Sequence, residues 1–189
     1  MNNFETCLRK YLDLFAGQEM YFVNDTRNLE LFKKNPENIN AEDIRTKISA
    51  INDAELQRLS VMEDMIHHMM ELGIDDRLKR GDLTLVDDIA NLTVKGEKHY
   101  LVHFASVYCN YHQPDLFPIY SDQHIDFYKR YIHEYKLALD PEKLNTYTVF
   151  SNALKDLVQR LGLTGKMNYL QIRKFGWLYA ESVVNEANA

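Results

Sequence analysis

Apolar side chains recur every three or four positions along most of the chain, and this spacing constrains the fold more than any other feature. Leu56, Leu59, Met62, Ile66 and Met69 keep the rhythm over several turns. Such spacing puts apolar residues on one face of an α-helix, and no convincing strand-like alternation accompanies it. Only seven Gly and four Pro occur in 189 residues, which argues against a turn-rich β-sandwich. The sequence therefore predicts an all-α protein.

Capping and breaking residues divide the chain into about eight or nine helices. The clearer segments are 4–15 ending near Gly17, 25–35 with Asp25 as cap, 40–51, a single helix from Asn52 or Asp53 to Gly73, Tyr100–Tyr111 after a Lys95-Gly96 turn, 125–139, 147–161, and a last helix capped by Asn168 with Gln171. The shorter pieces 74–79 and 85–92 show a weaker helical pattern. A chain of this length suits a single compact domain covering residues 1–189.

Negative charge is concentrated in the first half of the chain. Residues 1–94 contain 11 Lys or Arg and 18 Asp or Glu, a net charge of −7, whereas residues 95–189 contain 11 and 10, a net charge of +1. We therefore expect 1–94 to form an acidic helical layer of the domain. A net charge of −6 does not indicate general nucleic-acid binding, but the second half can still carry a local basic surface.

Cysteine usage and hydropathy indicate a soluble, cytoplasmic protein with no membrane partner. Cys7 and Cys109 cannot form a disulfide framework. The N-terminal segment lacks the apolar core of a signal peptide, and no apolar run approaches the ~20 residues that span a bilayer. The chain has no Gly-rich phosphate loop, no Cys pair at zinc spacing and no local signature of a Ser or Cys nucleophile, so we expect no cofactor.

Histidines provide the weak candidates for a metal site. His99 and His103 are four residues apart, which on a helix would place two imidazoles beside one metal ion. The Glu that follows the first His in zinc-protease helices is missing. His112 and His124 could add ligands only if the fold gathered them. Helical histidines beside an aromatic face, hydrogen-bonded to a carbonyl or carboxylate, are the commoner outcome, so we predict no metal site.

One segment resembles a motif of uncharacterised bacterial helical proteins. It reads His103-Phe-Ala-Ser-Val-Tyr-Cys-Asn-Tyr-His-Gln-Pro-Asp-Leu-Phe-Pro-Ile-Tyr-Ser-Asp122. In its usual form the motif is Ser-Phe-Ala-Ser-Lys-Tyr-Cys, an aromatic residue, His, a spacer, Pro, then Phe/Tyr-Pro-Ile-Tyr-Asp-Ser. The last helix, with Trp177 after the Arg173-Lys174 pair, is similar to that family's ending. The resemblance covers roughly residues 95–180.

The same segment is distantly similar to helix-hairpin-helix DNA glycosylases of the 8-oxoguanine type. That resemblance implies a nucleophilic Lys on one helix and an Asp near the start of the next, acting on a base flipped out of the stack. Here Val107 stands at the Lys position and Ser121 at the Asp position, with Asp122 one place later. Ser can still cap a helix but carries no charge. The resemblance therefore implies a scaffold that has lost the amine chemistry.

Two main functional hypotheses remain open. The first is a non-catalytic helical binding domain, with nucleic acid the partner that the resemblance implies. Its candidate contacts are Lys129, Arg130, Arg173, Lys174 and Trp177, because basic groups beside aromatic ones suit phosphate contact and base stacking. Ordinary solvated helix faces would show the same basic pairs.

The second hypothesis is an active enzyme. It would be either glycosylase-like, with Asp122, Asp126 or His112 as candidate catalytic residues, or metal-dependent around His99 and His103. A third alternative, a regulatory partner of another protein, fits the acidic first half of the chain.

Overall fold

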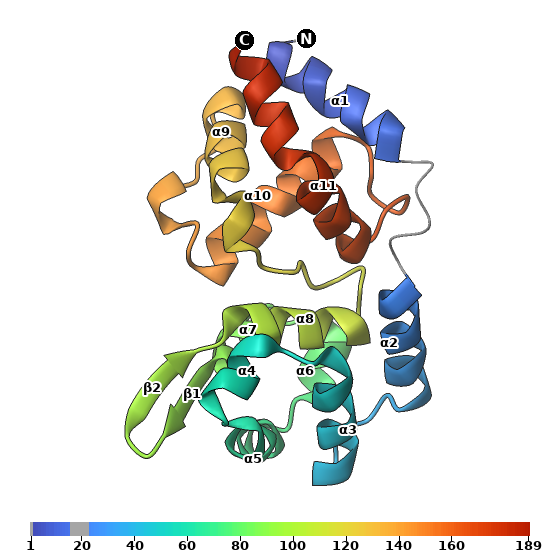
Figure 1. Ribbon diagram of the computed structural model, residues 1–189, viewed down its shortest axis with the longest axis vertical. Coiled ribbons are helices and arrows are strands. Elements are labelled where there is room, and N and C mark those ends of the chain that lie inside the picture. Colours follow the sequence, from blue (N-terminus) through green and yellow to red (C-terminus); the bar gives the residue numbers. More distant parts are fainter. Residues whose placement is uncertain (1, 16–22) are drawn as a thin grey trace. The chain divides into compact units, whose positions relative to one another are not determined.

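The computed structural model describes residues 2–15 and 23–189, and their regular structure is almost wholly helical (Figure 1). The expected all-α class is confirmed. The elements in chain order are α1 (Asn3–Phe15), α2 (Val23–Lys34), α3 (Ala41–Ile51), α4 (Ala54–Leu59), α5 (Met62–Leu72), α6 (Asp75–Arg80), α7 (Thr84–Ala90), β1 (Asn91–Val94), β2 (Glu97–Tyr100), α8 (Val102–His112), the 3₁₀-helix η2 (Asp122–His124), α9 (Ile125–Tyr135), the 3₁₀-helix η3 (Pro141–Lys143), α10 (Tyr147–Arg160) and α11 (Tyr169–Asn188). No helix in the described ranges is long and apolar enough to cross a membrane.

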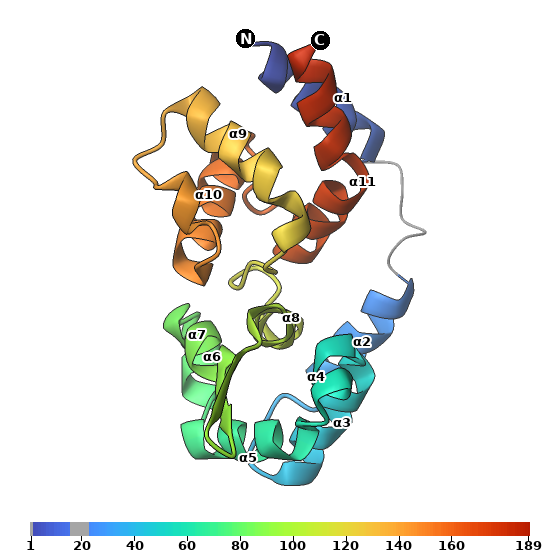
Figure 2. The ribbon, with the colours of Figure 1, turned by 60° about the vertical axis from the view of Figure 1, so that its left-hand side comes forward.

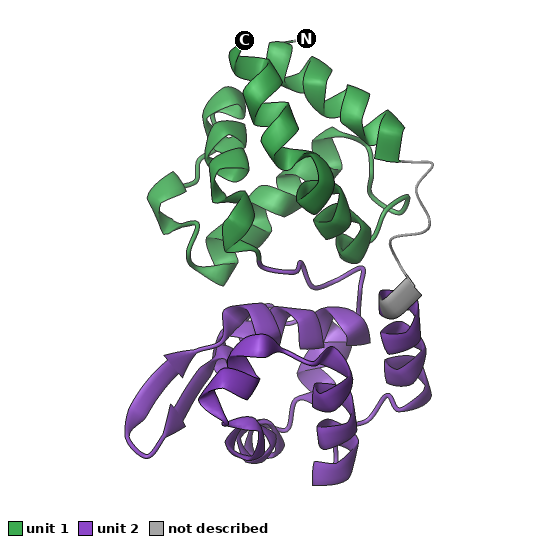
Figure 3. Ribbon diagram, viewed as in Figure 1, with its two compact units in different colours: residues 1–22, 121–189 green, residues 23–120 purple. Residues whose placement is uncertain are grey.

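The chain divides into two compact units (Figure 3). The terminal unit comprises residues 1–22 and 121–189, and the inner unit comprises residues 23–120. Residue 94, where the sequence analysis placed the edge of an acidic layer, is the last residue of β1 within the inner unit. The predicted acidic layer therefore coincides with neither unit.

In the terminal unit both ends of the chain pack together, and α1 runs alongside α11 in two views (Figures 1 and 2). Phe4 of α1 is buried, with its ring 5.7 Å from that of Phe127 in α9. The side-chain amide of Asn3 donates to the carbonyls of Glu186 and Ala187 in the last turn of α11. These contacts fix α11 against α1 and α9, and α11 carries much of the candidate site.

The inner unit is built around α8, of whose eleven residues nine are buried. The short hairpin of β1 and β2 precedes it, although the sequence predicted no strand there and a helix from Tyr100 onward. Lys95 and Gly96 both have positive φ, 50° and 85°. Two such residues form the tight turn that joins antiparallel strands, so the predicted turn is confirmed. Four-residue strands are too short to show an alternating pattern in the sequence.

Helix boundaries account for the other differences. Asp25 lies inside the first turn of α2 rather than capping it, and its carboxylate accepts a hydrogen bond from the Tyr111 hydroxyl at 2.8 Å. The helix expected up to Gly73 is two helices, because Ser60 takes a left-handed conformation (φ 56°) and ends α4. With both short segments α6 and α7 also helical, the described residues hold eleven α-helices rather than eight or nine. The predicted end near Gly17 lies outside the described residues.

A buried lysine lies at the centre of the inner unit. The Lys47 side chain is 0% exposed. Its amine donates to the Glu37 carbonyl oxygen at 2.6 Å and to Asn38 Oδ1 at 2.7 Å, and lies 5.8 Å from the centre of the Phe32 ring. Burial lowers the pKa of Lys47 from 10.5 to about 8 because charge loses solvation in a protein interior. The fold therefore supplies polar contacts in place of water for this amine.

The Asn38 side chain makes hydrogen bonds to residues of three helices, α3, α6 and α8. Its Oδ1 also accepts from the Tyr108 hydroxyl at 2.5 Å. Its Nδ2 donates to Asp75 Oδ1 at 2.6 Å and lies 3.3 Å from His112 Nε2. Two donors and two acceptors are the full capacity of an amide side chain. Because Asn38 Nδ2 can only donate, His112 Nε2 must be the acceptor, so the His112 ring is neutral with its proton on Nδ1.

The cap of α11 provides a test of the fold. Asn168 Oδ1 accepts from the Gln171 backbone N–H at 3.0 Å, and Gln171 Oε1 accepts from the Asn168 N–H at 2.9 Å, as the sequence predicted. Asn168→Ala should lower the free energy of unfolding by about 1 kcal/mol in urea titrations, since backbone donors lose their acceptor. The control Asn152→Ala, at an exposed position inside α10, should cause no loss. Equal effects would contradict the cap.

The neutral state of His112 predicts a pH dependence. Burial, followed by the charge of Lys47, lowers the pKa of His112 from 6.5 to about 3. Below pH 6.5 the unfolded chain binds a proton that the folded chain does not, so stability falls as pH falls. Between pH 7 and pH 5 this group should cost about 2 kcal/mol of unfolding free energy.

The variant His112→Gln keeps an acceptor for Asn38 but cannot titrate. Urea unfolding at pH 7 and pH 5 should therefore show a smaller loss in the variant than in the wild type. The same loss in both proteins would contradict the assigned neutral state.

Candidate functional site

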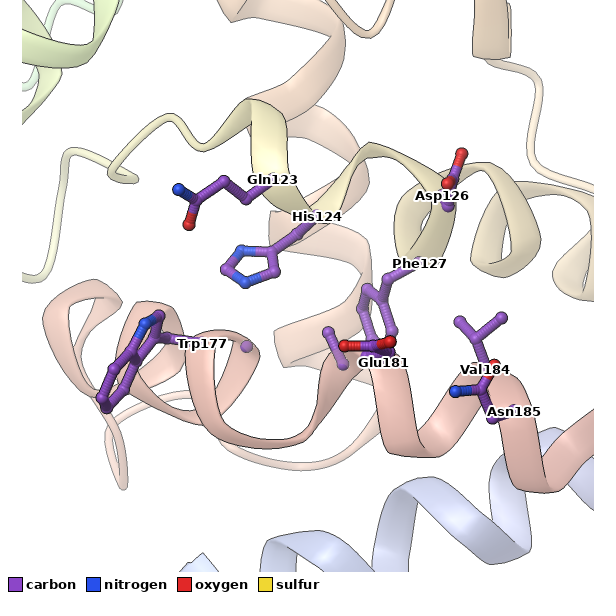
Figure 4. A pocket seen from close by; sticks show the side chains of 10 residues that line it. Gln123, His124, Asp126, Phe127, Trp177, Glu181, Val184 and Asn185 are labelled. Carbon is purple, nitrogen blue, oxygen red and sulfur yellow. The ribbon is translucent and has the colours of Figure 1, made fainter.

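A groove of about 480 Å³ crosses the terminal unit between the start of α9 and α11 (Figure 4). It is lined by Gln123, His124, Asp126, Phe127, Gly176, Trp177, Ala180, Glu181, Val184 and Asn185. All of these residues belong to η2, α9 or α11. The groove is therefore formed wholly by the C-terminal part of the terminal unit.

Helical spacing explains the wall that α11 contributes. Trp177, Glu181 and Asn185 follow one another at intervals of four residues, so they lie along one face of the helix. Gly176, one residue before Trp177, has no side chain, and a Cβ placed there would lie 3.4 Å from His124 Nδ1. Such a distance is an ordinary van der Waals contact, so the imidazole lies directly against α11, where Figure 4 shows it.

His124 is a partly buried group inside the groove. Burial lowers the pKa of His124, the nearby positive charge of Arg173 lowers it further, and the negative charge of Asp122 opposes both. Two conclusions follow. The ring is neutral at neutral pH, and Arg173 and Asp122 both lie close enough to His124 to act on its charge.

Trp177 is the most unusual residue of the groove. It is the only tryptophan in the chain, and 59% of its surface is exposed. Large aromatic side chains dominate binding energies where they are buried by a partner, and an exposed one beside a groove is a natural contact for a ligand. Arg173 and Lys174 precede it by four and three residues, so both cations lie within about one turn of it on α11.

The structure places the predicted catalytic residues as follows. Asp122 is the exposed first residue of η2, as expected, and Ser121 before it makes no side-chain capping hydrogen bond. Asp126 lines the groove, but its carboxylate points away from α11 (Figure 4). His112 belongs to the inner unit and its polar network. Of the predicted residues, Asp126 and Trp177 line the groove, and Asp122 lies close to the groove residue His124.

The Lys129-Arg130 pair does not line the groove. Lys129 lies 3.2 Å from Glu142, and Arg130 lies 2.7 Å from Glu134. Arg130 also lies over the Phe4 ring, 6.0 Å from its centre. Both cations therefore have carboxylate partners within the terminal unit, and Arg130 contributes to its packing. Of the predicted basic contacts, only Arg173 and Lys174 are close to Trp177 in sequence and on the helix.

The helical histidine pair was a wrong prediction. His99 lies in β2 and His103 lies in α8, so the spacing of four does not place them on one helix. His103 Nδ1 lies 3.3 Å from Asp53 Oδ2. The residues of ranges 2–15 and 23–189 contain no cluster of three His, Cys, Asp or Glu side chains that could hold a metal ion.

The position that corresponds to the motif's Lys is part of a core. Val107 is buried in α8, as expected, and belongs to the inner unit, whereas Ser121 is the first residue of the second segment of the terminal unit. His124 and Glu181 were missed as groove residues. Glu181 could have been predicted, because it lies four residues after Trp177 and so on the same face of the helix. Nothing in the sequence indicates that His124 faces α11.

The titration of His124 tests the geometry of the groove. Arg173→Gln should move the pKa of His124 upward towards its ordinary value, and Asp122→Asn should move it downward, because each removes one of the two opposing charges. The measurement is an NMR titration of the His124 ring protons. Lys129→Gln, which alters a cation paired with Glu142, should leave that pKa unchanged. An unchanged pKa in both groove variants would contradict the described arrangement.

Comparison with known proteins identifies a family but no activity. Residues 7–116 match the HI_0787_N family, which is described as an N-terminal domain. The groove lies after the matched range. An uncharacterized protein of Haemophilus influenzae is 32% identical over 125 residues, which cover 62% of this chain and 58% of that protein. The chain thus spans less than two thirds of the length of this relative, and no solved structure matches. The protein belongs to the HI_0787_N family of uncharacterised bacterial proteins.

Proposed function

We propose that the terminal unit binds single-stranded nucleic acid along the groove, with one base stacked on Trp177 and the adjoining phosphates beside Arg173 and Lys174. The observation that carries this proposal is the exposed indole of Trp177 at a groove, about one helical turn after two cations on the same helix. Aromatic stacking platforms beside basic groups are the usual means of binding single strands.

The order of side chains along α11 matches the order of groups in a nucleotide. Cations at 173 and 174 come first, followed by the aromatic ring of Trp177, and then by the carboxylate of Glu181. At a rise of about 1.5 Å per residue, the distance from 173 to 181 is about 12 Å, comparable with the length of one nucleotide. A phosphate, a base face and the amino edge of a base would meet complementary groups in that order.

The polar groups of the groove are suited to the edge of a base. Glu181 can accept hydrogen bonds from exocyclic amino groups, while the amides of Gln123 and Asn185 can both donate and accept. Neutral His124 adds one donor and one acceptor. These groups would not favour a second phosphate at the Glu181 end, which gives the proposed strand a direction along α11.

The charge of the terminal unit favours a single strand over a duplex. This unit contains 11 Lys or Arg and 11 Asp or Glu, a net charge of zero. Duplex binding normally involves a broad basic surface that contacts many phosphates. Stacking on Trp177 depends on a base whose face is accessible, as in a single strand. The proposal includes no cleavage of the nucleic acid, because Val107 stands at the position of the Lys that the glycosylase resemblance would require. The relationship to those enzymes stays a prediction.

Fluorescence anisotropy with a labelled single-stranded oligonucleotide tests the proposal. Trp177→Ala should weaken binding by about 10- to 100-fold, because stacking contributes about 1–3 kcal/mol per base. Trp177→Tyr should retain most of the affinity, which separates loss of stacking from misfolding. The double variant Arg173→Gln/Lys174→Gln should reduce the slope of log affinity against log salt by about 1.4.

The matched control is Lys129→Gln, a cation of the same unit that does not line the groove. Its affinity and salt slope should equal those of the wild type. Absence of binding by the wild type, or equal binding by the wild type and Trp177→Ala, would rule out the proposal.

A further inference from the structure

The inner unit contains a second cavity, of about 340 Å³, within the range that the family match covers. Its walls come from α2, α6, the end of α8 and the residues that follow each of α2 and α8. The lining residues are Leu29, Phe32, Lys33, Pro36, Asp75, Leu78, Lys79, Tyr111, His112, Gln113 and Pro114. Ligand sites commonly begin at about 300 Å³, so the cavity has room for one small molecule.

Two polar residues that line this cavity, Asp75 and His112, are oriented by hydrogen bonds to Asn38. Asn38 donates one N–H to Asp75 and the other to His112, and its backbone N–H also donates to the second oxygen of Asp75 at 3.0 Å. The buried amine of Lys47 in turn holds the Asn38 carbonyl group. Orientation by such a supporting layer is typical of groups that recognise a ligand.

The tautomer of His112 defines what the cavity can offer. Because Nε2 accepts from Asn38, the proton of the neutral ring is on Nδ1, which is left as a donor. Each oxygen of Asp75 accepts one hydrogen bond from Asn38 and retains capacity for another. The lining of the cavity thus includes one donor and one acceptor, a pair that an amide-like edge of a nucleobase can complement.

The remaining walls suit the other parts of a nucleotide. Leu29 and Pro36 provide accessible apolar surface, whereas Phe32 and Tyr111, which also line the cavity, are almost wholly buried, and the Phe32 ring lies edge-on to His112 with centroids 4.8 Å apart. Lys33 and Lys79 are exposed residues that also line the cavity, so they lie at its rim. Two cations at a rim can bind a phosphate group that the apolar walls would exclude.

We propose that this cavity binds a nucleoside 5′-monophosphate, with its base against Leu29 and Pro36 and its edge read by His112 and Asp75, and with its phosphate between Lys33 and Lys79. This site is separate from the groove of the terminal unit and does not depend on the function proposed for that groove. It would give the matched N-terminal domain a small-molecule ligand of its own.

Isothermal titration calorimetry with each nucleoside 5′-monophosphate, its nucleoside and inorganic phosphate tests the inference. At least one monophosphate should bind at a single site, at least about tenfold more tightly than its nucleoside or inorganic phosphate. Lys33→Gln/Lys79→Gln should reduce the affinity for that monophosphate to the level of the nucleoside. His112→Phe, which has no N–H donor, should weaken monophosphate and nucleoside alike.

The controls identify the site. Lys34→Gln/Arg80→Gln removes two neighbouring exposed cations that do not line the cavity, and should leave binding unchanged. Trp177→Ala removes the stacking platform proposed for the terminal groove, so it should retain the tight monophosphate binding of the inner cavity even where weaker binding in the groove is lost. No saturable binding of any monophosphate would overturn the inference. Binding lost in Trp177→Ala but retained in Lys33→Gln/Lys79→Gln would overturn it too, and would place the nucleotide in the terminal groove instead.

Discussion

The inner unit depends on how it solvates one buried amine. Lys47 has no exposed surface, and an unsolvated ammonium would be too costly for a unit of this size. The amide of Asn38 resolves this by bonding Lys47 while joining α6 and α8 through Asp75, Tyr108 and His112. Every position of that amide is used, so a change in any one partner leaves another polar group unpaired. This mutual dependence holds three helices and a loop in one arrangement, and that arrangement forms the back of the inner cavity.

The terminal unit follows a different principle. Its core includes a series of aromatic contacts, in which Phe4, Phe127, Tyr128 and Phe150 make successive ring contacts. Along α11, two cations, an indole and a carboxylate follow one another. One unit places its polar groups inside, where they orient a small cavity. The other places them along an open groove, which suits an extended ligand.

Local rules predicted much of the fold. The start of α3 after Asn40, the Asn168 cap of α11, the end of α5 at Gly73 and the Lys95-Gly96 turn were all predicted, because each depends only on neighbours in sequence. The break between α4 and α5 at Ser60 was not predicted, because no local sequence pattern indicates that a serine adopts the left-handed backbone conformation. The role of Asn38 was not predicted either, because its hydrogen-bond partners are 9, 37, 70 and 74 residues away in the sequence. Of the groove, Trp177 and Asp126 were predicted, whereas the approach of His124 to Gly176 depends on tertiary packing.

The fluorescence of Trp177 gives the most direct measurement of the proposed nucleic-acid function. It is the only tryptophan in the chain, so its emission reports on the groove alone. Titration with a single-stranded oligonucleotide should quench that emission to saturation and protect the indole from acrylamide, and added salt should weaken both effects because phosphate contacts are screened. Emission and acrylamide access that stay constant throughout the titration would contradict the account.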